Sequence, residues 1–115
     1  HLIDVSATFR DITGAKYPSI INGKKTKTPV GKSLLPIFKG KEREIHHEIY
    51  WRFNRANAVR QGDLKVVRAG KVWELYDLKA DPTEMNNLAK QMPEKTSELA
   101  NLWEDWNKET KSRPK

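Results

Sequence analysis

The sequence predicts an α+β fold in which a small four-stranded antiparallel sheet packs against a C-terminal amphipathic helix. Short aromatic and β-branched runs separated by turn signals fill residues 48–78, which indicates an antiparallel meander. An apolar stripe at helical spacing lies near the end of the chain. At 115 residues the chain is long enough for one modest core, so we expect residues 1–115 to form a single domain.

The N-terminal region is expected to hold two short helices joined by a long loop. The apolar residues of the first helix, Val5, Phe9 and Ile12, lie at i, i+4 and i+7. Asp4 or Ser6 can cap its start, and Gly14 stands at its end. Two prolines and two glycines interrupt residues 15–32, which predicts a surface loop without regular structure. Ser33 and Gly40 then bracket a helix of one or two turns.

The sheet and the final helix follow in order. The predicted strands are 48–53, 57–60, 64–68 and 71–78. A hairpin turn is expected at residues 61–63. A second turn is expected to begin at Asp81 and to cap a brief helical turn that runs through Leu88. Pro93 suits the first position of the last helix, and residues 111–115 are expected to be frayed. The apolar stripe of this helix is Leu99, Leu102, Trp103 and Trp106.

Composition excludes several classes of protein. No apolar run approaches the roughly 20 residues that cross a bilayer. The chain has no cysteine, so it offers no disulfide, Cys-ligated zinc site or thiol nucleophile. Its 22 Lys and Arg against 15 Asp and Glu give a net charge of +7, which favours anionic partners in general. The start at His1, without Met or a signal peptide, indicates a cut inside a longer chain.

Motifs for catalysis in the chain itself are weak. There is no Gly-x-Ser-x-Gly, and the sequence before Gly31-Lys32-Ser33 lacks the first glycine of a phosphate-binding loop. His46 and His47 are adjacent, so on a strand they would point to opposite faces. We therefore expect one packed and one solvated histidine at a strand entrance, not a metal site.

The basic residues allow two interpretations. Arginines on the strand that carries Tyr50, Trp51 and Phe53 would suit an anion-binding face, because guanidinium groups bind sulfate and phosphate with paired donors. Alternatively, loop lysines are simply solvated and strand arginines lie over aromatic rings. For four residues the two interpretations remain open: Arg52, Asn54, Arg55 and Arg60.

Five ordered motifs resemble the C-terminal subdomain of the sulfatase family, and together they cover almost the whole chain. They are His1-Leu2-Ile3-Asp4 through Gly14, Gly31-Lys32-Ser33-Leu34-Leu35-Pro36, Ala58-Val59-Arg60-Gln61-Gly62-Asp63 after Tyr50-Trp51, Trp73-Glu74-Leu75-Tyr76-Asp77-Leu78, and Asp81-Pro82-Thr83-Glu84 with Asn87-Leu88-Ala89. The resemblance implies a four-stranded sheet with a helix packed on it, which agrees with the elements predicted above.

The resemblance also implies an upstream catalytic domain that hydrolyses sulfate esters. In the family that domain uses a formylglycine and a divalent cation, usually calcium. The motif that yields formylglycine is absent from this chain, and the family's cation ligands lie upstream of the motif at His1. We therefore expect the segment to be catalytically inactive alone. Family members are often exported, which favours a periplasmic or secreted enzyme.

Two departures from the family pattern stand out. Ala7 occupies a position where the family often has proline. Residues 52–57 are rich in arginine and asparagine, in a stretch that in the family lies near the active-site mouth. This predicts recognition of an anionic or polyhydroxylated group, such as a sulfated sugar. The candidate substrate-binding residues are Trp51, Arg52, Asn54, Arg55 and Arg60.

Two alternatives belong to other functional classes. The +7 charge would suit a stand-alone module that binds nucleic acid or sulfated polysaccharide, although no nucleic-acid motif is present. The stripe around Trp103 and Trp106 would suit a helix that docks a partner. We favour a core role for this stripe, because a sheet this small needs a covering helix.

Overall fold

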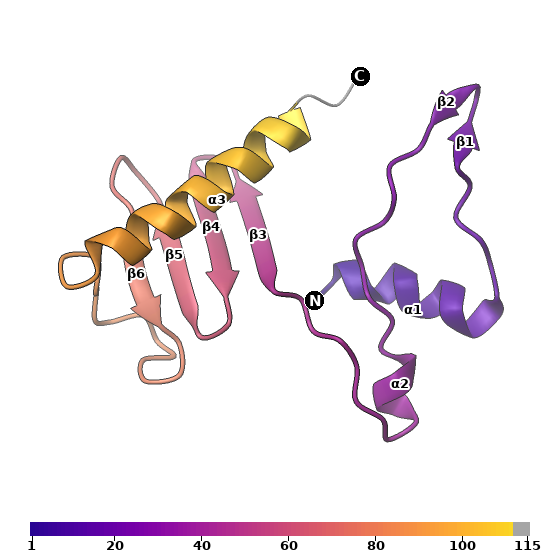
Figure 1. Cartoon of the computed structure of the whole chain (residues 1–115), viewed down its shortest axis with the longest axis horizontal. Helices are drawn as coiled ribbons and strands as arrows, with labels where there is room; N and C mark the ends of the chain where they lie inside the picture. Colours follow the sequence, from indigo (N-terminus) through magenta and orange to yellow (C-terminus); the bar gives the residue numbers. More distant parts are fainter. Residues whose placement is uncertain (112–115) are drawn as a thin grey trace. The chain divides into compact units, whose positions relative to one another are not determined.

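A computed structural model describes residues 1–111 and groups the chain into two compact units (Figure 1). Unit 1 comprises residues 1–46 and unit 2 begins at His47. The expectation that residues 1–115 form one domain stays a prediction. In the part of the chain that the structure describes, no helix is long and apolar enough to cross a membrane.

Unit 1 begins with helix α1, Ile3–Thr13, which ends as predicted at Gly14 with a left-handed φ of 70°. The predicted cap is wrong. Leu2 occupies the N-cap position and no side chain caps the helix. Asp4 instead lies inside the first turn, where it is fully buried and bonded to distant residues.

Residues 15–32 contain a small hairpin, so the expectation of no regular structure was wrong. Strand β1, Ile20–Ile21, pairs antiparallel with β2, Lys24–Lys25. Asn22 and Gly23 connect them with φ values of 51° and 74°. Asn-Gly readily adopts positive φ at both central positions of a hairpin turn. This dipeptide was therefore the signal in the sequence that the expectation of a loop overlooked.

The second predicted helix is confirmed as α2, Leu35–Phe38, with Gly40 at a φ of 68° just beyond its end. The cap differs by one residue, because Leu34 holds the N-cap position. Ser33 still contributes, since its hydroxyl accepts a hydrogen bond from the Leu35 amide at 3.1 Å.

Unit 2 is built on the predicted four-stranded antiparallel meander, in the order β3-β4-β5-β6. The strands are β3 Glu48–Phe53, β4 Ala56–Gln61, β5 Leu64–Arg68 and β6 Glu74–Asp77. The last strand is shorter than predicted at both ends, because residues 71–73 and Leu78 lie outside the ladder. Gly62 has a φ of 59° in the expected turn between β4 and β5.

Helix α3, Pro93–Lys111, covers one face of this sheet (Figure 1). It starts at Pro93 as predicted. The core of unit 2 joins the sheet to the helix through fully or nearly fully buried side chains: Val59, Val66, Leu75, Leu99 and Trp103. The apolar stripe of α3 is thus core, with Leu102 and Trp106 packed at its margin, and it is not left exposed to dock a partner.

The segment before α3 differs from the prediction. Residues 81–88 form turns without a helical turn. The Asp81 carboxylate accepts a hydrogen bond from the Asn86 amide at 2.7 Å, and Glu84 adopts a φ of 58°. At its other end, α3 includes Lys111. The fraying expected for the tail stays a prediction, and residues 112–115 lie outside the described residues.

Candidate functional site

A polar groove of about 570 Å³ lies in unit 2 where the ends of β3, β4 and β5 meet α3. It is lined by amides, charged groups and one indole: Arg52, Asn54, Asn57, Arg68, Trp103, Glu104, Asn107 and Lys111. Three of these side chains are basic and one is acidic. The groove therefore offers guanidinium, ammonium and amide donors to an anionic or hydroxyl-rich ligand.

Strand register places the sheet side of this groove. Arg52 lies opposite Asn57, and Asn57 lies opposite Arg68 on the next strand. Residues directly opposite in a sheet share a face, so the three side chains form a row. The Asn57 side-chain amide satisfies both neighbours when its oxygen and nitrogen are exchanged: the nitrogen then donates to the Ala56 carbonyl and the oxygen accepts from Arg68, each at 3.1 Å.

Helix α3 supplies the opposite side of the groove. Tyr50 stacks on Trp106, with ring centroids 5.1 Å apart and planes within 6°. The Trp103 indole donates a hydrogen bond to the Trp51 carbonyl at 2.9 Å. These contacts hold α3 against β3, and they bring the buried Asn107 within 2.7 Å of Arg52, whose guanidinium donates to the amide oxygen.

Arg68 forms the floor of the groove through aromatic contacts. Its guanidinium carbon lies 4.5 Å from the ring centroid of Trp73 and 5.3 Å from that of Trp103. It also pairs with Glu104 at 3.2 Å. Because the two indole rings and the Glu104 carboxylate hold its position, Arg68 presents positive charge with little conformational freedom left to lose on binding.

The structure brings only part of the predicted substrate-binding set together. Arg52 and Asn54 line the groove, with Asn54 at a φ of 53° in the turn after β3. Arg55 is exposed in the same turn. Arg60 points to the other face of the sheet near its opposite end, where its Nε donates to the Gly62 carbonyl at 2.7 Å.

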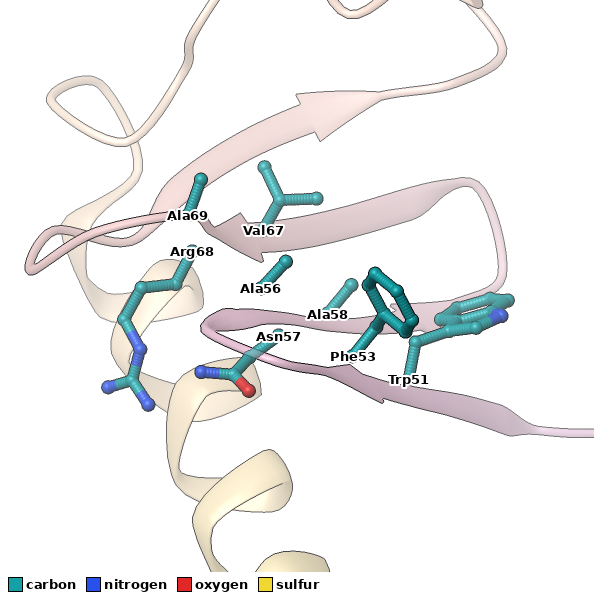
Figure 2. Close-up of a pocket in the computed structure, with 8 residues that line it drawn as sticks. All are labelled: Trp51, Phe53, Ala56, Asn57, Ala58, Val67, Arg68 and Ala69. Atoms are coloured by element: carbon teal, nitrogen blue, oxygen red, sulfur yellow. The ribbon is translucent and has the colours of Figure 1, made fainter.

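Trp51 lies on the face away from α3, in an apolar hollow of about 160 Å³ (Figure 2). Its neighbours there include Phe53, Ala58 and Val67. Adjacent strand residues point to opposite faces, so Trp51 and Arg52 cannot serve the same side of the sheet. In Figure 2, Arg68 extends away from Trp51, toward the helix.

Sequence reasoning missed the residue that completes the groove from the helix. Asn107 follows Trp103 by four positions, so it continues the buried stripe of α3 with a polar side chain. A buried amide needs a hydrogen-bond partner. A polar side chain in the buried stripe was therefore the signal in the sequence that α3 makes a buried hydrogen bond at this position. The partner itself lies 55 positions earlier in the chain.

The histidine pair behaves as expected. His46 is packed in unit 1, with its Nε2 2.6 Å from the Asp4 carboxylate, while His47 is exposed. Burial would raise the pKa of Asp4, but hydrogen bonds from the Lys32 amide, His46, the amino terminus and Arg43 outweigh it and hold that pKa well below its ordinary value. Within residues 1–111, no three His, Cys, Asp or Glu side chains are grouped so that they would hold a metal ion.

A family model for the N-sulphoglucosamine sulphohydrolase C-terminal region matches residues 1–112. The chain belongs to this family of sulfatase C-terminal domains. The family confirms the resemblance drawn from the five motifs, and it gives no support to the stand-alone binding module.

Relatives agree with the family. The domain is 30% identical over 122 residues to an N-acetylglucosamine-6-O-sulfatase of Bacteroides thetaiotaomicron, covering 95% of this chain and 21% of the relative. It is 29% identical to an uncharacterised sulfatase of Schizosaccharomyces pombe, with the same two coverages. The chain thus spans about a fifth of the length of these relatives.

Solved structures show the same fold. A protein in complex with its substrate D-glucosamine-2-N,6-O-disulfate matches with a TM-score of 0.63 and 28% identity, over 96% of this chain and 24% of that one. A 2-O glycosaminoglycan sulfatase matches with a TM-score of 0.67 and 26% identity, over 95% of this chain and 25% of that one.

Proposed function

We propose that this sulfatase C-terminal domain belongs to a sulfuric ester hydrolase that acts on a sulfated sugar, and that its polar groove contacts the substrate. In this proposal the domain packs on an upstream catalytic domain and shapes the substrate pocket. The observation that carries the proposal is the row of fixed donors formed by Arg52, Asn57 and Arg68, which Asn107 completes from α3.

The reaction itself would belong to the catalytic domain. A formylglycine would supply the nucleophile for sulfate transfer, and calcium would stabilise the charge on the sulfate group. Residues 1–111 do not fit such a centre, because they hold no cysteine, none of their serines stands in a Ser-x-Pro/Ala-x-Arg sequence, and they have no grouped set of carboxylate ligands. We therefore derive no catalytic step from this domain and assign its side chains to binding alone.

Positioned donors explain why the groove suits a sulfated sugar. A guanidinium group binds a sulfate through two parallel N–H donors, and amides bind sugar hydroxyls as donor and acceptor. Arg52 is already held at 2.7 Å by Asn107, so little side-chain entropy is lost when a ligand binds. Asn54 stands at the exposed turn beside it, where it would contact the outer part of a ligand.

The test is steady-state kinetics of the intact enzyme on a panel of sulfated mono- and oligosaccharides. Arg52→Ala and Asn54→Ala should each raise KM, or change the preferred sugar, while kcat on a small aryl sulfate stays within about twofold. Arg60→Ala is the matched control, because Arg60 lies on the other sheet face. Arg55→Ala and Trp51→Ala complete the series for the residues first predicted.

Two results would contradict the assignment to the groove. Unchanged KM and preference in both Arg52→Ala and Asn54→Ala would remove the groove from substrate binding. An effect of Arg60→Ala or Trp51→Ala larger than that of Arg52→Ala would move the binding site to the opposite face. Absence of sulfatase activity from the intact protein on every sulfate ester would refute the enzyme proposal itself.

A further inference from the structure

The two arginines that line the polar groove are held by partners of different charge. The Arg52 guanidinium donates to the Asn107 amide oxygen at 2.7 Å, and this amide is neutral. The Arg68 guanidinium instead pairs with the Glu104 carboxylate at 3.2 Å. A neutral acceptor fixes a guanidinium without opposing its charge, whereas a carboxylate opposes it. Arg52 therefore keeps more of its charge for an anionic ligand than Arg68 does.

Exposure separates the same two side chains. Arg52 is exposed at the end of β3, whereas the Arg68 side chain is only 23% exposed and lies over the rings of Trp73 and Trp103. A guanidinium has five N–H donors. Within residues 1–111, the Arg52 side chain uses one of these donors, for Asn107. Arg52 can therefore turn paired donors toward a sulfate group, while most of the Arg68 guanidinium is already covered.

Helix α3 repeats this difference along the groove. Glu104, Asn107 and Lys111 all line it, at intervals of three and then four residues. Residues at these intervals are neighbours on one side of a helix. The carboxylate stands beside Arg68, the amide beside Arg52, and Lys111 one turn beyond the amide. The groove is thus close to neutral at the Arg68 end and positive at the Arg52 end.

The two ends are far enough apart to contact different parts of one ligand. Arg52 lies opposite Asn57, and Asn57 lies opposite Arg68, so two strand spacings separate the arginines. That separation is roughly 10 Å between their backbones. The groove volume of about 570 Å³ is that of a site for a whole small molecule and exceeds the need of a single ion.

We infer that the groove orients a sulfated sugar by charge, with a sulfate group at the Arg52 end and uncharged hydroxyls at the Arg68 end. Glu104 repels a sulfate group, but its carboxylate accepts hydrogen bonds from hydroxyls. Asn107 is the positioning residue of this arrangement, because it fixes Arg52 and leaves its charge unopposed. This assignment rests on the proposed function, since it states which part of the sugar lies at each end of the same groove.

Two substitutions that keep side-chain shape test the assignment in the full-length protein. Asn107→Asp places a carboxylate beside Arg52, and Glu104→Gln removes the carboxylate beside Arg68. The probe is a κ-carrageenan tetrasaccharide, in which sulfated and uncharged sugar units alternate, and the desulfated tetrasaccharide is its uncharged counterpart. Because Trp103 lines the groove, stopped-flow tryptophan fluorescence can report binding before any ester is hydrolysed.

Two further variants make the comparison decisive. Asn101→Asp is the matched control, because Asn101 is exposed on α3 and is not among the residues that line the groove. Lys111→Gln removes a positive charge at the Arg52 end from an exposed position, in case Asn107→Asp does not fold. Thermal unfolding by circular dichroism first confirms that each variant is folded.

The expected changes have opposite signs at the two ends. Asn107→Asp should raise the dissociation constant of the sulfated tetrasaccharide roughly tenfold, because it opposes one charged contact. Lys111→Gln should raise the same constant roughly threefold, and Glu104→Gln should lower it by a similar factor. Asn101→Asp should leave it unchanged. For the desulfated tetrasaccharide, every variant should stay within about twofold of the parent.

Four outcomes overturn the inference. They are parental binding in both Asn107→Asp and Lys111→Gln, weaker binding in Glu104→Gln, an equal loss for the desulfated sugar, and no binding of the sulfated tetrasaccharide by the parent protein. Sulfatase activity in a protein that shows one of these outcomes would leave the enzyme proposal standing. Binding with the expected changes, in a protein that hydrolyses no sulfate ester, would refute the enzyme proposal and leave this inference standing.

Discussion

Replacement of Arg68 by methionine tests how the aromatic cluster fixes the groove. The guanidinium carbon lies 4.5 Å and 5.3 Å from the ring centroids of Trp73 and Trp103, and one of its nitrogens lies 3.2 Å from Glu104. Methionine keeps an unbranched apolar stem of similar reach and removes both the charge and the planar group. The variant therefore isolates the electrostatic and stacking contributions from simple packing.

The expected loss follows from the exposure of these groups. Arg68 is 23% and Glu104 40% exposed, so their ion pair resembles a surface pair worth about 0.2–1 kcal/mol. Contacts of a partly desolvated cation with aromatic rings contribute about 0.5–2 kcal/mol. Together the change should lower the free energy of unfolding by about 1–3 kcal/mol. With a urea m-value of ~1.5 kcal/mol/M, the midpoint should fall by ~0.7–2 M.

Urea unfolding of the 115-residue chain, followed by far-UV circular dichroism, measures this shift. Arg68→Lys keeps the charge but loses the planar group, so its midpoint should lie between those of the parent and Arg68→Met. Arg60→Met is the matched control, because within residues 1–111 the Arg60 side chain hydrogen-bonds only to the Gly62 carbonyl in the next turn, so its replacement should cost little. A parental midpoint for Arg68→Met, or an equal loss in Arg60→Met, would refute the reasoning.

Three further predictions concern the core, a close backbone contact and pH. Leu99 is fully buried in the core of unit 2, so Leu99→Ala should cost about 2–5 kcal/mol in the same urea experiment, and a loss below about 1 kcal/mol would contradict that core. A Cβ atom on Gly31 would collide with the Ile3 carbonyl oxygen, so Gly31→Ala should displace the loop at this residue. Tryptic cleavage after Lys32 should then be faster, and an unchanged cleavage rate would show that the loop accommodates the added atom. The lowered pKa of Asp4 adds stability that is present above its unfolded pKa of about 3.9 and is lost as pH falls through the lower folded pKa. The difference in melting temperature between the parent and Asp4→Asn should therefore shrink below about pH 4, and an equal difference at pH 2.5 would argue against the ion pairs.

Local sequence signals predicted most of the fold. Strands β3 and β5 have the predicted bounds, and α3 begins at Pro93 because proline suits the first turn of a helix. Gly14 and Gly40 mark helix ends, since both adopt a positive φ that other residues disfavour. The β1–β2 hairpin was equally local and was missed only because Asn22-Gly23 was interpreted as a break in structure.

The family was also within reach of the sequence, because its motifs are short, ordered and local. The sequence could not predict which residues line the polar groove. Arg52 and Trp51 are neighbours in the chain, yet strand alternation sends one to the groove and the other to the apolar hollow on the far face. Alternation along the strand places Trp51 and Arg52 on opposite faces, but it does not reveal which face of the sheet α3 covers.

Tertiary packing decided the long-range pairs. Asn107 meets Arg52 because stacking of Trp106 on Tyr50 helps set the rotation of α3 over the sheet. Asp4 meets Arg43 and His46 because a loop folds back across α1, which no periodicity along the chain encodes. The sequence by itself determined which segments become helices and strands, since that depends on neighbouring residues. Only the tertiary structure decided which polar groups share a buried site, since that depends on how whole elements pack.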